Sequence, residues 1–332
     1  MIRRSTRYAC AAALAALFLP LLAASAQQNV PAAPVQNEPA PPAPAPAAPA
    51  FPKPDPVNFT ASTPTTEQIN NFLQTSWGYD TNRVWQVEAI LKTPVPGLSK
   101  VVVYVREKIG DQKPSALQFF ALPDGQHIIA GEEVLPFGDH PYAEYRTMLQ
   151  QQADGPFRGS PSKDLELVEF ADFECPHCKE AQATMDRLAV DFPKARIVFQ
   201  NYPLVRIHPA AMTAASYGVC VAKLGGSTAF FQFAAAVFDG QEGLATADGA
   251  TLTLNGAVTK AGLDPAKVSA CAATTEVQQQ VAASVKLAQD LNVNQTPTLM
   301  VNGRQVPIGG LPYDTLKQII EYQAKLDGVA GQ

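Results

Sequence analysis

Residues 165–178 read LELVEFADFECPHC, an apolar run that ends in two cysteines separated by Pro and His. The run is rich in Leu, Val and Phe, a composition typical of a buried β-strand. After the second cysteine, apolar side chains recur at helical spacing, at Ala181, Met185, Leu188, Ala189 and Phe192. The sequence therefore predicts that both cysteines lie where a strand passes into a helix.

The Cys-Pro-His-Cys motif at this junction favours a reactive pair of thiols. Pro176 suits the first position of a helix, where a missing N–H costs nothing. Cys175 is then at the helix N-terminus, where free N–H groups and the helix dipole favour a thiolate. Cys178 faces the same side of the first turn, so the two can form a reversible disulfide. We expect Cys175 to be an exposed nucleophile, acidified by the dipole and by His177, and Cys178 to be the resolving thiol.

A static structural disulfide and half of a metal site are two other uses of such a motif. A zinc site needs more ligands, and the sequence contains no second C-x-x-C and no H-x-x-x-H. Haem attachment needs a histidine after the second cysteine, where Lys179 stands. Redox chemistry without a metal is therefore the favoured interpretation.

The first 26 residues have the pattern of a secretory signal peptide. Three arginines come first, an apolar stretch covers residues 9–24, and Ala24-Ser25-Ala26 forms a cleavage site. A membrane anchor is the alternative, but the apolar stretch is shorter than the ~20 residues of a span and contains Pro20. We expect a soluble protein exported to the periplasm or another extracytoplasmic space.

Charge and cysteine content indicate which partners and which disulfides to expect. Cleavage would remove three positive charges, so the net charge would move from -5 to about -8. No basic run interleaved with aromatic residues is present, which argues against nucleic acid as a partner. Besides the motif, Cys220 and Cys271 remain, and in an oxidising compartment we expect them to form a structural disulfide. Two buried thiols are the alternative.

The length of 332 residues suits two domains. Residues 27–57 are mostly Pro and Ala and predict a disordered, extended linker. Residues 58–152 predict a small α+β domain with an antiparallel sheet, and residues 153–163, with Gly-Pro and Ser-Pro turns, predict an interdomain linker. The expected elements of the small domain are a helix over 65–77, strands over 84–91, 100–107, 117–122 and 127–130, and a closing helix over 142–152.

A second domain is expected over residues 164–328. Its elements come in the order strand, helix, strand, a helical block over about 208–291, a two-stranded hairpin, and a final helix over 312–325. Glycines at 225, 226, 240 and 262 and Pro265 predict breaks within the helical block. Asn302-Gly303 is a strong turn signal for the hairpin.

The string EFADFECPHC resembles the DsbA-like thiol-disulfide oxidoreductases of the bacterial envelope, and the resemblance runs from about Asp164 to Leu326. It implies an α/β thioredoxin fold with a helical insertion. The string Gln295-Thr296-Pro297-Thr298 resembles the cis-proline loop of this fold. That resemblance implies that Thr296 and Pro297 bind an extended substrate segment by strand addition.

Glu169 stands inside the apolar strand, six residues before Cys175. A buried carboxyl without a charged partner has a raised pKa and can exchange a proton. An acid at this spacing has that role towards the second cysteine in the DsbA-like family, which implies the same for Glu169 and Cys178. A glutamate paired with a nearby lysine is the alternative.

Segments 92–98 and 122–131 resemble the amino-terminal dimerisation domain of DsbC-type disulfide isomerases. The resemblance implies a possible homodimer. An independent peptide-docking domain or a spacer is the alternative.

Together these features predict a periplasmic thiol-disulfide oxidoreductase without an organic cofactor. Its partners would be exported proteins with thiols or disulfides and a membrane redox partner that resets the active site. Pro176-His177 favours an oxidase, whereas Thr296 and a dimerisation domain favour an isomerase or reductase. A chaperone-like adaptor with a secondary redox site is the alternative from another class.

Overall fold

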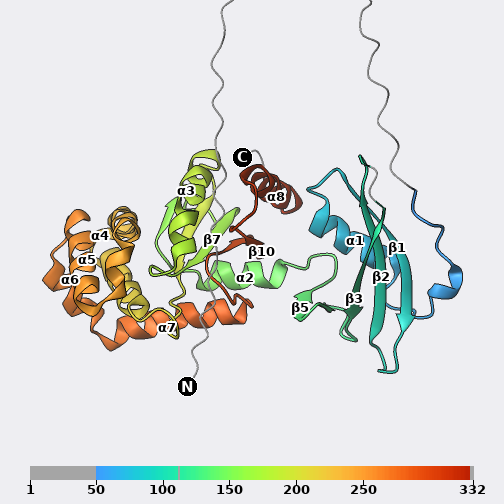
Figure 1. The fold of residues 1–332 in the computed structure, drawn as a ribbon, viewed down its shortest axis with the longest axis horizontal. Coiled ribbons are helices and arrows are strands. Elements are labelled where there is room, and N and C mark those ends of the chain that lie inside the picture. Colours follow the sequence, from blue (N-terminus) through green and yellow to red (C-terminus); the bar gives the residue numbers. More distant parts are fainter. Residues whose placement is uncertain (1–49, 111–112, 330–332) are drawn as a thin grey trace, which may run out of the picture. The chain divides into compact units, whose positions relative to one another are not determined.

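The computed structural model describes residues 50–110 and 113–329 (Figure 1). The predicted signal peptide at 1–26 and most of the predicted linker at 27–57 lie outside the described residues. At the end of that linker, Asp55 caps a short 3-10 helix, η1 (Pro56–Asn58).

The first sheet has five antiparallel strands in the order β1-β2-β3-β4-β5. Their bounds are β1 (Arg83–Lys92), β2 (Ser99–Glu107), β3 (Ser115–Ala121), β4 (His127–Ala130) and β5 (Glu133–Pro136). Helix α1 (Thr66–Trp77) begins with a capping box between Thr65 and Gln68, and its Ile69, Phe72 and Leu73 share a core with the sheet. The predicted helix and four strands are confirmed. Strand β5 was not predicted, because four residues that include Pro136 show no usable alternation.

The second sheet has the order β10-β9-β7-β8-β6. The strands are β6 (Phe157–Gly159), β7 (Glu166–Ala171), β8 (Arg196–Asn201), β9 (Thr298–Val301) and β10 (Arg304–Pro307). Central strand β7 runs parallel to β8 and antiparallel to β9. All six residues of β7 are buried, Glu166 and Glu169 included, which is why its apolar residues do not alternate with exposed polar ones.

Strand β6 corrects the prediction that residues 153–163 are only a linker. Its three residues pair antiparallel with β8, so this segment forms an edge of the second sheet. Gly159 has φ 83°, and a Cβ there would lie 2.2 Å from the Ala195 carbonyl oxygen. Three residues between turn-forming glycines and prolines are too few to show a strand period, so composition alone indicated a linker.

Helices cover both faces of the second sheet. On one face, α3 (Pro176–Asp191) and α8 (Tyr313–Leu326) share a core with the sheet, and on the other face α2 (Ala143–Gln152) and α7 (Thr275–Asp290) do so (Figure 1). The helix predicted over 142–152 therefore exists, but the expectation that it closes the first domain is wrong. Its Leu149 packs in one cluster with Val168 and Phe170 of β7. A helix pattern shows that one face is apolar, and it does not show which sheet that face covers.

The helical block consists of α4 (Ala211–Asp239), the 3-10 helix η2 (Gln241–Ala245), α5 (Ala247–Lys260), α6 (Pro265–Ala272) and α7, and α4, α5 and α6 lie together beside the sheet (Figure 1). Most predicted breaks are found, since Gly226 interrupts α4 with φ 74°, Gly240 ends it, and Pro265 starts α6. The break at Ala273-Thr274, between α6 and α7, was not predicted.

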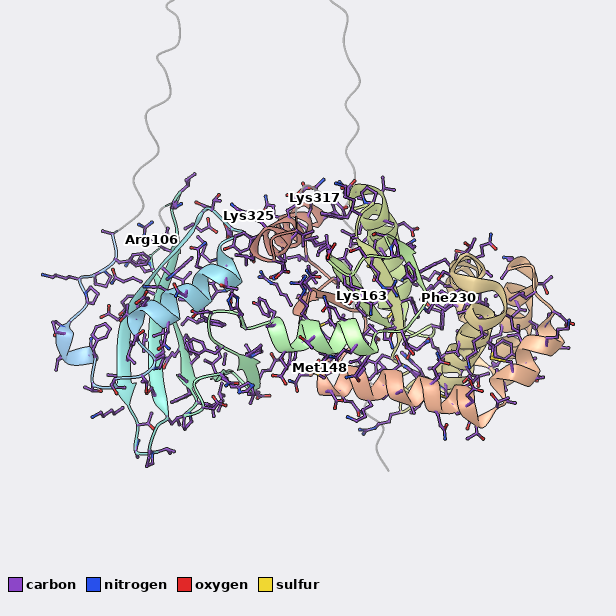
Figure 2. The ribbon with its side chains drawn as sticks, turned by 180° about the vertical axis from the view of Figure 1, so that it is seen from behind. Arg106, Met148, Lys163, Phe230, Lys317 and Lys325 are labelled. Carbon is purple, nitrogen blue, oxygen red and sulfur yellow. A yellow bond between two sulfur atoms is a disulfide. The ribbon has the colours of Figure 1, made fainter. Side chains whose placement is uncertain are left out.

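Helix α4 forms the centre of the insertion. Among the described helices it is long and apolar enough to cross a membrane by length and composition, yet its Phe230 (labelled in Figure 2), Phe233 and Phe238 pack against Phe173 in the core. A disulfide joins Cys220 of α4 to Cys271 of α6, with Cα atoms 5.9 Å apart. These contacts are those of a core helix of a folded domain.

Candidate active site

The dithiol motif lies at the junction of β7 and α3. Cys175 is the N-cap residue of α3 and Pro176 is its first helical residue, as predicted. The loop turns sharply just before, where the Cys175 N–H donates to the Asp172 carbonyl oxygen over 3.1 Å. The two cysteines of the motif are not bonded to each other in this structure.

The surroundings of the Cys175 thiol stabilise its thiolate. The neighbouring Cys178 thiol lowers the pKa of Cys175 to about 5, and the Thr296 side chain and the backbone N–H groups of Cys178 and His177 act in the same direction against the effect of burial. The Cys175 Sγ lies 3.5 Å from the Thr296 carbonyl oxygen. The expectation that Cys175 is exposed is wrong, since only 5% of the residue is accessible.

His177 interacts both with Glu180 and with the charge of Cys175. Its ring is exposed, and its Nδ1 lies 3.1 Å from the Glu180 carboxylate, whose hydrogen bond is the main cause that raises the pKa of His177. The charge of Cys175 raises the same pKa to a smaller extent. The ring is therefore hydrogen-bonded to Glu180, while its interaction with the charge of Cys175 and the His177 backbone N–H both favour the Cys175 thiolate.

Cys178 has the opposite electrostatic character. Its side chain is completely buried, and the Asp172 N–H donates to its Sγ over 3.4 Å. Burial, followed by the hydrogen bond with Cys175, raises the pKa of the Cys178 thiol. The pair therefore holds its negative charge on the first cysteine and its proton on the second.

Glu169 lies beneath the motif and is 3% exposed. The Gln182 Nε2 donates to the Glu169 Oε1 over 2.9 Å and to the Cys178 carbonyl oxygen over 3.0 Å, so Gln182 connects the acid to the helix that carries the dithiol. Burial raises the pKa of Glu169 to about 7. A carboxyl with this pKa can give and take a proton near neutral pH.

Replacing Glu169 with glutamine should change how stability depends on pH. The pKa of Glu169 is about 7 in the folded state, against the 4.5 of an ordinary glutamate in the unfolded chain. The folded protein therefore binds more protons between these pH values, and its stability falls as the pH rises through this window. For Glu169→Gln, the unfolding free energy relative to wild type should increase by up to about 3 kcal/mol from pH 4 to pH 8. Urea unfolding at the two pH values measures it.

The exposed residue Glu144 provides the matched control. Glu144→Gln removes a carboxylate from the surface of α2 and should shift the same difference by less than about 0.5 kcal/mol. A Glu169→Gln variant that behaves like Glu144→Gln would show that Glu169 is ionised like an exposed acid, and would remove it from the proton pathway.

The loop before β9 completes the site. The Thr296–Pro297 peptide bond is cis. The Thr296 Oγ1 is buried and is not paired with another protein group. The Thr296 side chain lowers the pKa of Cys175. The structure thus brings Cys175, Cys178, Thr296 and the start of β9 together, with Glu169 below. Cys220 and Cys271 are in the insertion and take no part in this group.

Sequence analysis did not single out three polar residues around the motif, Asp172, Glu174 and Gln182. The buried Asp172 carboxylate accepts hydrogen bonds from the Glu174 N–H (2.8 Å), the Leu204 N–H (2.7 Å) and the His208 Nδ1 (2.8 Å). The Glu174 Oε2 accepts one from the Ala210 N–H at 2.8 Å. The sequence did contain one signal for these contacts, namely acidic residues within an apolar run. Such residues need hydrogen-bond partners when they are buried.

Comparison with known proteins agrees with this geometry. A family model described as Thioredoxin matches residues 151–322, slightly more than half of the chain. The chain belongs to this thioredoxin family. Its carboxy-terminal half is a thioredoxin-like domain with the dithiol of a thiol-disulfide oxidoreductase. The family match begins at residue 151, so the resemblance of the first domain to DsbC-type isomerases remains a prediction.

Curated relatives of this thioredoxin-family chain include longer proteins. The Na⁺/H⁺ antiporter NhaA 3 of Salinispora tropica is 32% identical over 148 residues, which are 45% of this chain and 22% of the antiporter. The antiporter NhaA 1 of Mycolicibacterium vanbaalenii is 32% identical over 149 residues, 44% of this chain and 23% of the relative. The chain therefore spans less than a quarter of the length of these relatives.

Solved structures similar to this thioredoxin-family chain come from several organisms. A thioredoxin-like oxidoreductase from Silicibacter pomeroyi is 25% identical with a TM-score of 0.46, and the match covers 54% of this chain and 98% of that one. DsbA2 of Pseudomonas aeruginosa is 27% identical with a TM-score of 0.43, and the match covers 51% and 93%. A periplasmic thioredoxin-like protein from Salmonella enterica is 19% identical with a TM-score of 0.45, and the match covers 55% and 97%.

Proposed function

We propose that this protein exchanges disulfides with exported proteins through Cys175 and Cys178, and that it acts chiefly as an oxidase. The observation that carries the proposal is the contrast between the two thiols. The pKa of Cys175 is lowered to about 5, while the pKa of the buried Cys178 is raised. This contrast makes Cys175 the group that attacks and leaves, and Cys178 the group that resolves.

The oxidation of a client dithiol would proceed in two exchanges. A client thiolate attacks the Cys175 Sγ of the Cys175–Cys178 disulfide, a bond forms between client and Cys175, and Cys178 leaves as a thiolate that takes a proton. The second client thiolate then attacks the client sulfur of this mixed disulfide and releases Cys175 as a thiolate. Two electrons pass from the client to the protein, and the client gains a disulfide. Glu169, whose charge acts on the Cys178 thiol and which Gln182 connects to the Cys178 carbonyl oxygen, would supply the proton to Cys178.

The direction of exchange follows from the stability of the reduced form. Lowering the pKa of the attacking thiol stabilises the reduced protein relative to its disulfide, which makes the disulfide more oxidising. Lowering the pKa of the Cys175 thiol from the ordinary 9.0 to about 5 stabilises the reduced form by about 3 kcal/mol at pH 7. Because this pKa is depressed, the stabilisation is present at higher pH and is lost as the pH falls through about 5.

The reduction potential of the Cys175/Cys178 pair tests the oxidase proposal. We expect a value near the ~-120 mV of a strong oxidant in glutathione buffers, with the Cys220–Cys271 disulfide left intact. Quantifying reduced and oxidised protein after acid quenching gives the value. A potential at or below about -200 mV would argue against an oxidase and for a reductase or isomerase.

Isomerase activity is the second candidate, and Thr296 before the cis-proline is the observation that favours it. It would require a reduced dithiol and, if the first domain pairs as in DsbC-type proteins, a homodimer. Sedimentation of the full chain would distinguish the dimer from a monomer. A chaperone-like adaptor predicts instead that Cys175→Ala keeps the main activity.

The proposed setting is the cell envelope. Clients would be proteins with free or mispaired cysteines that have been exported, and a membrane redox partner would return the dithiol to its working state. A protein that donates disulfides to its clients suits an oxidising compartment.

A further inference from the structure

The loop that leads into the dithiol, residues 172–175, is attached to the helical insertion. The Phe173 ring stacks on Phe199 of β8 at 5.1 Å and contacts Phe230, Phe233 and Phe238 of α4 at 5.3 to 6.2 Å. These ring contacts fix the loop from its apolar side. Its backbone carbonyl groups, however, need donors of their own.

Gln241 supplies those donors from the insertion. Its Nε2 donates to the Phe173 carbonyl oxygen over 2.8 Å and to the Cys175 carbonyl oxygen over 2.9 Å. An amide nitrogen carries two hydrogens, so a single side chain serves both carbonyls. Gln241 is the first residue of η2, directly after Gly240 ends α4, and this turn directs its side chain to the loop.

The Cys175 carbonyl is also the first acceptor of helix α3. It accepts from the Cys178 N–H over 3.1 Å and from the Lys179 N–H over 3.3 Å. The Gln241 bond adds a third donor from outside the helix. The Phe173–Glu174 and Cys175–Pro176 peptide planes are thereby held in place, and with them the position of the Cys175 Sγ relative to the N–H groups of α3 and to Thr296.

We propose that Gln241 is a positioning residue through which the helical insertion holds Cys175 against the N-terminus of α3 and so sets the reduction potential of the dithiol. Gln241 does not touch the sulfur, and it acts through the backbone of Cys175. The inference rests on the proposed redox function and extends it to a residue more than 60 positions further along the chain.

Three substitutions in the full-length protein test this inference. Gln241→Met keeps the length of the side chain and removes both donors, Gln241→Glu replaces the donors with a carboxylate that can only accept, and Glu242→Gln changes the exposed neighbour in η2 as a control. The readouts are the equilibrium with glutathione, the pH midpoint for alkylation of Cys175, and urea unfolding of the same samples.

For Gln241→Met we expect the dithiol to become less oxidising by about tenfold in the equilibrium constant, or about 30 mV. The alkylation midpoint should move to higher pH, and Gln241→Glu should change both quantities further because a carboxylate repels the two carbonyls and the thiolate. Glu242→Gln should leave both at the wild-type values.

A purely structural role for Gln241 would lower the unfolding free energy and leave the alkylation midpoint and the potential unchanged, and that result would overturn the inference. If Gln241→Met does not fold, Gln241→Asn, which is too short to reach both carbonyls, provides the same comparison. The alkylation midpoint is measured without a client, so it tests the role of Gln241 independently of disulfide exchange. A wild-type protein that is inactive in disulfide exchange would contradict the proposed function alone.

Discussion

Cys175→Ser should abolish disulfide exchange, with a rate at least about a thousandfold below that of wild type. The nucleophile in the exchange is a thiolate, and the pKa of Cys175 at about 5 keeps this thiol ionised at neutral pH. A serine hydroxyl is not ionised at that pH and forms no disulfide. Oxidative refolding of a reduced, disulfide-containing client, followed by the recovery of its activity, measures the loss.

Cys178→Ser gives the complementary result. The variant keeps the Cys175 thiolate but lacks the resolving thiol, so mixed disulfides with clients should accumulate and appear on non-reducing gels as bands that a reductant removes. Cys220→Ser combined with Cys271→Ser is the control, because this pair is bridged within the insertion and is not part of the dithiol site. Full activity of Cys175→Ser would contradict the proposed function and would favour the chaperone-like alternative.

The core of the site was predictable because its determinants are local. A strand, a helix-starting proline and two cysteines follow one another within residues 165–178, so a single stretch specifies the strand, the turn and the position of the nucleophile. The same holds for the last hairpin. Asn302 and Gly303 have φ values of 47° and 88°, which is the backbone that an Asn-Gly turn favours.

The parts that sequence analysis missed depend on contacts between distant segments. Strand β6 is identified by its pairing with β8, and the placement of α2 is decided by the cluster around Val168. Cys175 is buried in one cluster with residues of the helical insertion, and its Sγ lies 3.5 Å from the carbonyl oxygen of Thr296, 121 residues away. The spacing of apolar residues and a short motif each describe only one continuous segment of the chain. They therefore do not show which distant segments come into contact.

The hydrogen bonds of the buried carboxylates near the motif also come in part from distant segments. Among these carboxylates, Asp172 should contribute strongly to the stability of the protein. Its side chain is completely inaccessible, and it accepts two backbone N–H bonds and one from His208. Asp172→Ala would leave these donors buried without an acceptor, and the imidazole without its ion-pair partner. We expect the unfolding free energy to fall by about 3 to 5 kcal/mol, measured by urea unfolding of the reduced protein at pH 7.

Asp186→Ala is the control for Asp172→Ala, because it removes an ion pair at an exposed site. Asp186 lies 2.6 Å from the Arg158 guanidinium in the same domain, but 68% of its side chain is exposed, so its removal should cost less than about 1 kcal/mol. The contrast arises because water replaces the lost partner at Asp186, whereas the donors around Asp172 point to a side chain that is completely buried. Equal losses in the two variants would show that those donors find other acceptors, and that the loop before Cys175 does not depend on the Asp172 carboxylate.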